Sequence, residues 1–346
     1  MTQRRTRWAL VLPLALVALV LAACETEPAE DIDEDVADAE DSDDNGEVAV
    51  EGGERDDIEI VMITHGQAAD PFWTVAVNGA EVAAEDLGID FTYQAPDEFD
   101  MVEMSSLIDA AVADEPDGIA VSIPDADGLE DAINSAVEAD IPVVSLNSGD
   151  DVYEEMGVLA HVGQSEELAG YEGGAELADA GATNALCVNH EQGNVALDLR
   201  CEGFLESMEE AGAEAGQLAV EGTDAVESQE RIEAALIEDD TIDGILALGP
   251  LGADPAINAL EEQGMTDDVA IGTFDLGPDI LDAVDAGDML FAIDQQQYLQ
   301  GYLPVHMLTQ QAETGTMPVG EVLTGPGFVF QEDAADVMDL TEEGLR

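Results

Sequence analysis

The chain has 346 residues, of which 81 are Asp or Glu and 7 are Lys or Arg, so its formal net charge is −74. All seven basic residues are arginine. A surface this acidic repels phosphate groups, and nucleic acid is therefore excluded as a partner.

The first 24 residues have the pattern of an export signal. Three arginines in the first seven residues precede an apolar run from Trp8 to Val20, and small residues stand directly before Cys24. A membrane-spanning helix needs about 20 apolar residues, and Pro13 interrupts this run, so we expect a signal peptide. It resembles a bacterial lipoprotein signal in which Cys24 becomes the lipidated first residue. The alternative is an ordinary cleaved signal that leaves Cys24 free.

Residues 25–57 form a predicted tether. About half of them are Asp or Glu, and large apolar residues are nearly missing. Such a segment buries too little apolar surface to offset its ordering entropy, so we expect it to be disordered and extended. It has no Asp-x-Asp-x-Asp-Gly loop, so a calcium site is not expected. The signal and the tether together predict an extracytoplasmic protein. Its N-terminal lipid would anchor it to the outer face of the cell membrane, or it would lie in the periplasm.

From residue 58 to about residue 330, short β-branched runs alternate with Ala- and Glu-rich stretches of helical periodicity. The predicted strands are Ile58–Thr64, Ile89–Tyr93, Gly118–Ser122, Ile141–Leu146, Leu159–Val162, Ala185–Asn189, Gln217–Val220, Gly244–Leu248, Val269–Phe274 and Met289–Asp294. Nearly continuous apolar strands between helices are typical of parallel sheets covered on both faces. Roughly 270 such residues suit two linked domains, so the expected fold class is α/β with two Rossmann-like lobes.

Polar and aromatic residues gather just after the first strand. His65 follows it, and Pro71 fits the first turn of a helix with Asp70 as its N-cap. Phe72 and Trp73 are adjacent and point about 100° apart on that helix, so they cannot both face its core stripe. Either they stack on the apolar face of a sugar ring, or they pack in the core.

Three later strands also end in polar residues. Asn147 follows the fourth strand, where its amide suits hydroxyl groups, although a turn explains it nearly as well. Asp275 follows the ninth strand and either binds a ligand or caps the next helix. Gln295 begins a run of three glutamines after the tenth strand, for which we expect a binding or hinge role.

The stretch from residue 187 to residue 204 combines two cysteines with a rare cation. Cys187 and Cys201 lie 14 positions apart, and in an oxidising compartment we expect them to form a disulfide. Arg200 either binds a ligand, together with Asn194 in the preceding loop, or forms an ion pair with a carboxylate of its own helix such as Glu202. His190 lacks the partners that a metal site or a Cys-His nucleophile requires, so no metal, cofactor or catalytic residue is expected.

Together these pieces resemble the ribose/galactose-type periplasmic binding proteins of the type I fold, which serve sugar ABC importers. The resemblance covers about residues 58–330. In that family an aromatic pair sandwiches the sugar while polar side chains bond its hydroxyls. Carried over to this chain, the family's binding residues are Asp70, Phe72, Trp73, Arg200, Asp275 and Gln295, to which we add His65, Asn147 and Asn194 as candidates.

The resemblance has two departures. Asn147-Ser148 and Gly249-Pro250 stand where a ribose binder usually has Asp-Arg and Asn-Asp. This implies a related monosaccharide or a sugar alcohol rather than ribose.

The resemblance also implies a domain organisation and partners. One lobe would hold residues 58–163 and 296–325, and the other residues 164–295 and 326–346, with a hinge of three crossings between them. Closure of a monomer around its ligand would give a shape that an ABC permease recognises.

Other function classes remain as alternatives at this point. A sensor that presents its ligand to a membrane histidine kinase or chemoreceptor would look the same in sequence. An enzyme acting on carbohydrate would need paired carboxylates or an activated nucleophile, and no Gly-x-Ser-x-Gly or His-Glu-x-x-His motif is present. The export signal excludes a transcriptional repressor of the same fold.

The charge predicts dependence on salt. Self-repulsion at −74 destabilises the compact state at low ionic strength, and it is screened when the Debye length falls to about 3 Å near 1 M salt. We hypothesise that the source organism lives in, or accumulates, high salt. The melting temperature should therefore rise steeply between low and molar KCl; a flat curve would remove the hypothesis.

Overall fold

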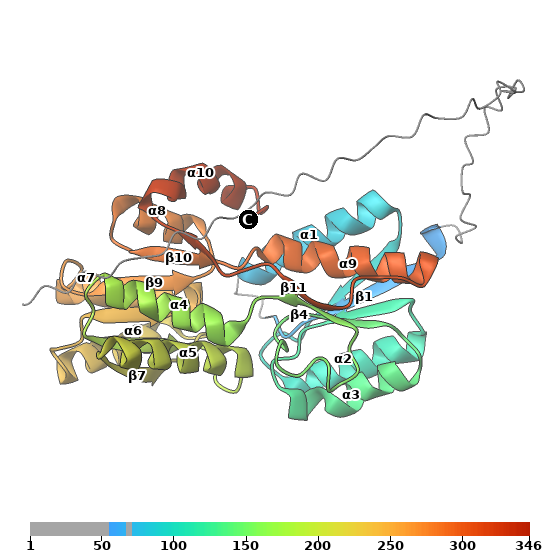
Figure 1. Ribbon diagram of the computed structural model, residues 1–346, viewed down its shortest axis with the longest axis horizontal. Coiled ribbons are helices and arrows are strands. Elements are labelled where there is room, and N and C mark those ends of the chain that lie inside the picture. Colours follow the sequence, from blue (N-terminus) through green and yellow to red (C-terminus); the bar gives the residue numbers. More distant parts are fainter. Residues whose placement is uncertain (1–54, 67–70) are drawn as a thin grey trace, which may run out of the picture. The chain divides into compact units, whose positions relative to one another are not determined.

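The computed structural model describes residues 55–66 and 71–346. The predicted signal peptide with Cys24, the tether up to residue 54 and the candidate Asp70 lie outside these residues. The described part begins with a 3-10 turn, η1 (Arg55–Asp57), and continues as two separate six-stranded sheets flanked by helices (Figure 1).

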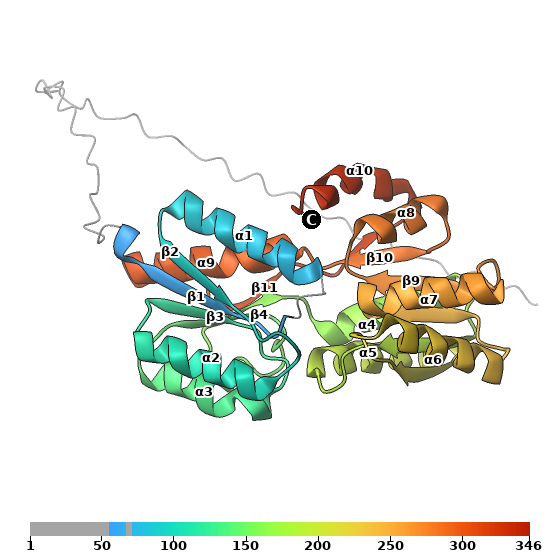
Figure 2. The same ribbon diagram turned by 180° about the vertical axis from the view of Figure 1, so that it is seen from behind.

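The first sheet is parallel throughout. Its order is β11-β5-β4-β3-β1-β2. The strands are β1 (Glu59–Ile63), β2 (Asp90–Gln94), β3 (Gly118–Val121), β4 (Val143–Asn147), β5 (Ala160–Gly163) and β11 (Gly320–Leu323). Helices α1 (Pro71–Leu87) and α9 (Gln297–Thr314) cover one face, and α2 (Met101–Asp114) and α3 (Ala126–Glu138) cover the other (Figures 1 and 2).

The second sheet has the order β12-β10-β9-β8-β6-β7. Its strands are β6 (Asn184–Asn189), β7 (Glu214–Ala219), β8 (Gly244–Ala247), β9 (Ala270–Phe274), β10 (Phe291–Asp294) and β12 (Gly327–Val329). One face carries α4 (Glu166–Asp179) and α5 (Val195–Ala211). The other carries α6 (Ala225–Glu238), α7 (Pro250–Gln263), α8 (Pro278–Ala286) and α10 (Gln331–Glu342).

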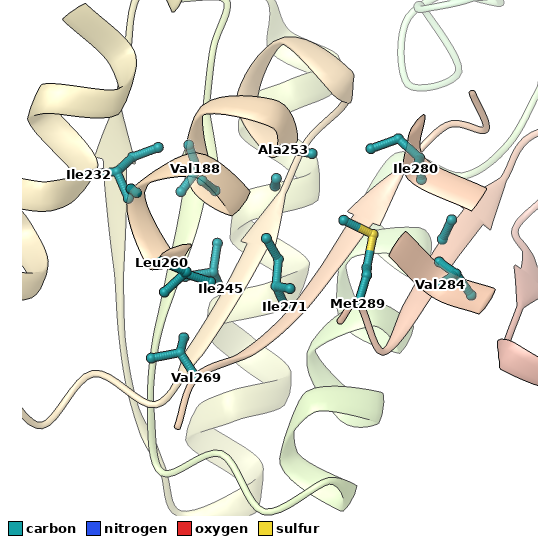
Figure 3. Packing of buried hydrophobic residues seen from close by; sticks show 14 of the residues in the cluster. Val188, Ile232, Ile245, Ala253, Leu260, Val269, Ile271, Ile280, Val284 and Met289 are labelled. Atoms are coloured by element: carbon teal, nitrogen blue, oxygen red, sulfur yellow. The ribbon is translucent and has the colours of Figure 1, made fainter. Parts of the chain in front are cut away.

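Buried aliphatic side chains fill the space between each sheet and its helices. On the α6–α8 side of the second sheet, Val188, Ile245 and Ile271 from three adjacent strands face Ile232 and Leu260 of the covering helices (Figure 3). Strands covered on both faces have no solvent-facing side, which explains why they read as continuous apolar runs.

The predicted α/β class with helices on both faces of each sheet is confirmed, and each of the ten predicted strands has a counterpart. The sequence prediction missed the edge strands β11 and β12, whose residues are mostly half-exposed or exposed and so give no apolar run. It also began β7 too late, at Gln217 instead of Glu214, because that edge strand contains no buried residue. The expectation of purely parallel sheets needs one correction, since β12 pairs antiparallel with β10.

The chain passes between the two sheets three times. It leaves the first sheet after β5 and enters α4, returns after β10 into α9, and leaves again between β11 and β12. Buried polar side chains join these passages: Gln300 Nε2 donates to the Gln295 carbonyl at 3.1 Å and to Thr324 Oγ1 at 3.1 Å. Thr324 Oγ1 in turn donates to the Gly163 carbonyl at 3.1 Å. The three passages therefore form one hydrogen-bonded unit.

Candidate functional site: a cavity between the two sheets

A cavity with about 390 Å³ of empty space, its mouth included, lies where the carboxyl ends of strands from both sheets meet. All of the predicted site residues that the structure describes line it: His65, Phe72, Trp73, Asn147, Asn194, Arg200, Asp275 and Gln295. The lining also includes residues that were not predicted as ligands: His190, Glu191, Leu197, Leu248, Gly249 and Pro250.

The aromatic wall of the cavity comes from the first turn of α1. Phe72 and Trp73 are 4% and 6% exposed, and their rings meet edge to face with centroids 4.8 Å apart. Both belong to the core of the first sheet and also line the cavity. Gly66 makes room for the indole, because a Cβ at that position would lie 2.6 Å from Trp73 Cγ. Core packing is therefore confirmed for both rings, and the expectation that they cannot both face the core is wrong. Stacking on a sugar ring stays a prediction.

His65 is held as a neutral imidazole. Burial, together with the charge of Arg200, lowers its pKa to about 3. Nδ1 lies 2.8 Å from Ser122 Oγ, and Nε2 lies 3.3 Å from Asn194 Nδ2. Because an amide nitrogen only donates, Nε2 accepts and Nδ1 carries the proton. His65 thus forms a neutral hydrogen bond from the first sheet to the second.

Asn194 is the N-cap of α5. Its Oδ1 accepts from the Ala196 amide at 3.0 Å, and its Nδ2 donates to Glu191 Oε2 at 2.7 Å as well as facing His65. In the conformation described here, the polar atoms of this side chain all have partners within the protein.

Gln295 bridges the two sides of the cavity. Its Nε2 donates to Asp275 Oδ1 at 2.5 Å, and its Oε1 accepts from Asn147 Nδ2 at 3.4 Å. Asn147 and Asp275 have left-handed backbones, with φ of 63° and 67°. The chain therefore turns sharply at the last residue of β4 and directly after β9, and both side chains line the cavity. The alternative in which Asp275 caps the next helix is wrong, because the N-cap of α8 is Gly277.

Arg200 forms a buried bidentate ion pair with Glu166 of α4. Nε donates to Oε2 at 2.5 Å and Nη2 to Oε1 at 3.1 Å, and the side chains are 3% and 0% exposed. Nη1 donates to the Leu248 carbonyl at 3.2 Å, and the guanidinium carbon lies 4.3 Å from the centre of the Phe274 ring. The alternative partner, Glu202 on the same helix, is wrong.

Two features fix α5 in place beside this ion pair. The predicted disulfide between Cys187 and Cys201 is confirmed, and it ties α5 to β6 directly after Arg200; closing a loop of this length contributes roughly 3 kcal/mol on the chain-entropy model. On the other side, α4 packs so closely that a Cβ on Gly170 would lie 1.9 Å from the Arg200 carbonyl oxygen. Glu166, one turn earlier on α4, is thereby brought alongside the guanidinium.

His190 is a lining residue that the sequence did not single out as a ligand. It is 8% exposed, and within residues 55–66 and 71–346 its Nδ1 has no hydrogen-bond partner. Burial and the charge of Arg200 lower its pKa to about 4, so it too is neutral. A neutral imidazole can both donate and accept, as a hydroxyl partner requires.

Neither a metal site nor a membrane helix is found in the described part of the chain. No group of three or more His, Cys, Asp or Glu residues there has the geometry to hold a metal ion. None of its helices is long and apolar enough to cross a bilayer.

Comparison with known proteins assigns the family. Residues 60–316 match the model of the periplasmic binding protein domain, which is most of the chain. The chain belongs to this family, and its fold is that of the type I periplasmic binding proteins.

Three relatives illustrate the match. A carbohydrate transporter from Acidothermus cellulolyticus, solved in complex with myo-inositol, is 36% identical; the alignment covers 84% of this chain and 99% of that one, with a TM-score of 0.79. The periplasmic sugar-binding protein of an ABC sugar transporter from Legionella pneumophila is 26% identical, with 78% and 99% coverage and a TM-score of 0.73. The xylose/arabinose-binding protein XylF of Sulfolobus acidocaldarius is 26% identical over 260 residues. That match covers 71% of this chain and 64% of XylF, just under two thirds of the relative's length.

The buried neutral histidines predict sensitivity to acid. An unfolded histidine titrates near 6.5, whereas the folded pKa is about 3 for His65 and about 4 for His190. The unfolded state therefore binds more protons as the pH falls from about 6.5 to about 4. In that window the free energy of unfolding should drop by on the order of 1–3 kcal/mol per histidine. Above about pH 6.5 their contribution is complete.

Thermal unfolding in molar KCl at about pH 7.5 and about pH 5 measures this effect. His65→Asn should lose less stability between the two pH values than the unmodified protein. His306→Asn, which replaces an exposed histidine outside the cavity, controls for the substitution itself. Carboxylate titration is common to all three proteins and cancels in the comparison. Identical pH slopes for His65→Asn and the unmodified protein would contradict the assignment.

Proposed function

We propose that this protein is an extracytoplasmic solute-binding protein. It captures a single-ring sugar or sugar alcohol in the cavity between the sheets and delivers it to the permease of an ABC importer. The observation that carries the proposal is convergence: eight predicted residues, spread from position 65 to position 295, line one cavity.

The lining suits hydroxyl groups. A sugar hydroxyl donates one hydrogen bond and accepts others, so its best partners are groups that do both or that work in donor–acceptor pairs. The amides of Asn147 and Gln295 and the neutral imidazoles of His65 and His190 do both. Asp275 accepts and Arg200 donates. Phe72 and Trp73, which also line the cavity, supply apolar surface for the carbon skeleton.

The relatives direct the choice of ligands for testing. The Acidothermus cellulolyticus protein was solved with myo-inositol, and XylF is named for xylose and arabinose. Inositols and pentoses are compact and carry several hydroxyls, which the polar lining of the cavity can bond. A cyclic polyol is therefore the first candidate and an aldopentose the second.

Two lobes closing by hinge bending would explain how such a buried ligand enters. The proposed lobes are residues 58–163 with 296–325 and residues 164–295 with 326–346. They are linked by the passages that follow β5 and β10 and by the one between β11 and β12. Contacts such as His65 with Asn194 and Asn147 with Gln295 join the two sides in the conformation described and would break on opening. We expect the protein to act as a monomer.

Ligand binding is tested by thermal shift and calorimetry in molar KCl against myo-inositol, pentoses, hexoses and linear polyols. A cognate ligand at 100 times its dissociation constant should stabilise the fold by about 2.7 kcal/mol. Arg200→Ala should lose this gain, whereas Arg231→Ala, which removes an exposed arginine of the second sheet's helices, should keep it.

Arg200→Lys serves as a second variant, because Arg200→Ala leaves Glu166 buried without its partner. The lysine keeps the charge but loses the planar fork, so binding should again weaken. Full ligand stabilisation in a folded Arg200 variant would refute the role of this residue, and no response to any polyol or sugar would refute the proposed function.

Membrane anchoring through Cys24 is a separate part of the proposal, supported by the residues that precede it. Expressed with its signal, the protein should partition into detergent with the membrane fraction, and Cys24→Ser should appear in the soluble extracytoplasmic fraction. A Cys24→Ser protein that still sediments with membranes would contradict lipid anchoring.

A further inference from the structure

The cavity has one cation, and that cation is already paired. Arg200 is the single Lys or Arg side chain among the described residues that line the cavity. Its side-on pair of donors, Nε and Nη2, meets both oxygens of Glu166, and Nη1 reaches the Leu248 carbonyl. A guanidinium has five N–H donors, so at most two remain for a ligand.

Glu166 is fixed independently of any ligand. Gln164, in the passage after β5, donates from Nε2 to Glu166 Oε2 at 3.0 Å. The Glu166 backbone amide donates to Asp150 Oδ2 at 3.3 Å. With its side chain 0% exposed, the carboxylate has no room to swing away from Arg200 when a ligand enters.

Other carboxylates set the sign of the local field. Asp275 and Glu191 line the cavity, and Asp150 accepts a hydrogen bond from the Glu166 backbone amide. The neighbouring histidines are neutral, because their pKa values of about 3 and about 4 are far below ordinary pH. An anionic ligand would therefore meet several carboxylates and one guanidinium whose charge Glu166 already balances.

We propose that Glu166 is a specificity-determining residue, which occupies the side-on face of Arg200 and thereby restricts the cavity to uncharged polyhydroxyl ligands. Carboxylate and phosphate counterparts of the same ring are rejected, because they would need the positive charge that Glu166 neutralises. This inference rests on the proposed function of sugar or polyol capture, and it assigns to that site the charge class of its ligand.

The test compares neutral ligands with their anionic counterparts by calorimetry in molar KCl. The pairs are D-glucose with D-glucuronate, D-galactose with D-galacturonate, and myo-inositol with myo-inositol 1-phosphate. The proteins are the unmodified chain, Glu166→Gln, and Glu167→Gln as a matched control. Glu167 is the next residue on α4 and is exposed, so its replacement removes the same charge without touching Arg200.

The unmodified protein and Glu167→Gln should bind the neutral member of a pair at least about a hundredfold more tightly than the anionic one. In Glu166→Gln this ratio should narrow by roughly tenfold or more, because at an effective dielectric constant of about 20 the removal of one unit charge even about 10 Å from the ligand changes its affinity by slightly more than tenfold. Binding of the neutral ligand itself should also weaken, because the glutamine replaces one of the two accepting oxygens by an NH2 group, which cannot accept from the guanidinium.

Two outcomes would overturn the inference while leaving the proposed function intact. One is unmodified protein that binds an anionic member as tightly as its neutral counterpart, a measurement that does not depend on a variant folding. The other is a folded Glu166→Gln that weakens both members by the same factor, which would make Glu166 a structural support only. If no neutral ligand binds the unmodified protein, the proposed function itself is refuted.

Discussion

The buried ion pair between Arg200 and Glu166 is the interaction on which the site depends. Removing two charges from water costs several kcal/mol per ion, and only good geometry with further hydrogen bonds offsets that cost. Both conditions are met here. The pair is bidentate, the carbonyl of Leu248 and the amide of Gln164 satisfy further positions, and the Phe274 ring lies under the guanidinium. The pair also joins α4 to α5, so the position of the cation in the cavity follows from how those two helices pack.

The surrounding fold serves this arrangement. In parallel α/β sheets ligands bind outside the carboxyl ends of the strands, and the cavity is built from residues at such ends in both sheets. The first turns of α5 are held by the disulfide at Cys201, which is a covalent bond, and by the close approach of the α4 backbone at Gly170. Gln295 connects the cavity to the passages between the sheets, because it contacts Asp275 and Asn147 and is itself held by Gln300.

Much of the fold and part of the site could be read from the sequence. Apolar runs located the central strands, and Asn147, Asp275 and Gln295 stood out as polar residues directly after such runs, although a turn or a helix cap offered another explanation for the first two. The sequence prediction missed the edge strands β11 and β12, because their half-exposed residues give no periodic pattern of apolar residues. Glu166 was not predicted as a site residue, for a different reason. In the sequence it is one acidic residue among 81, and only the packing of α4 against α5 distinguishes it from its exposed neighbour Glu167. His190 was considered only as a metal ligand or nucleophile, because sequence alone does not show that its ring would be buried and neutral.

The bonds that join the two sides of the cavity have a common character. Asn194 meets a neutral imidazole, Asn147 meets Gln295, and the Val195 amide donates to the Pro124 carbonyl at 2.9 Å. Dissolved ions screen interactions between net charges far more than those between dipoles at contact distance. We therefore expect the acidic exterior and the hydrogen bonds that join the two sides of the cavity to differ in their dependence on salt concentration. If salt stabilises the acidic exterior as its charge predicts, the bonds that close the cavity should depend far less on the salt concentration.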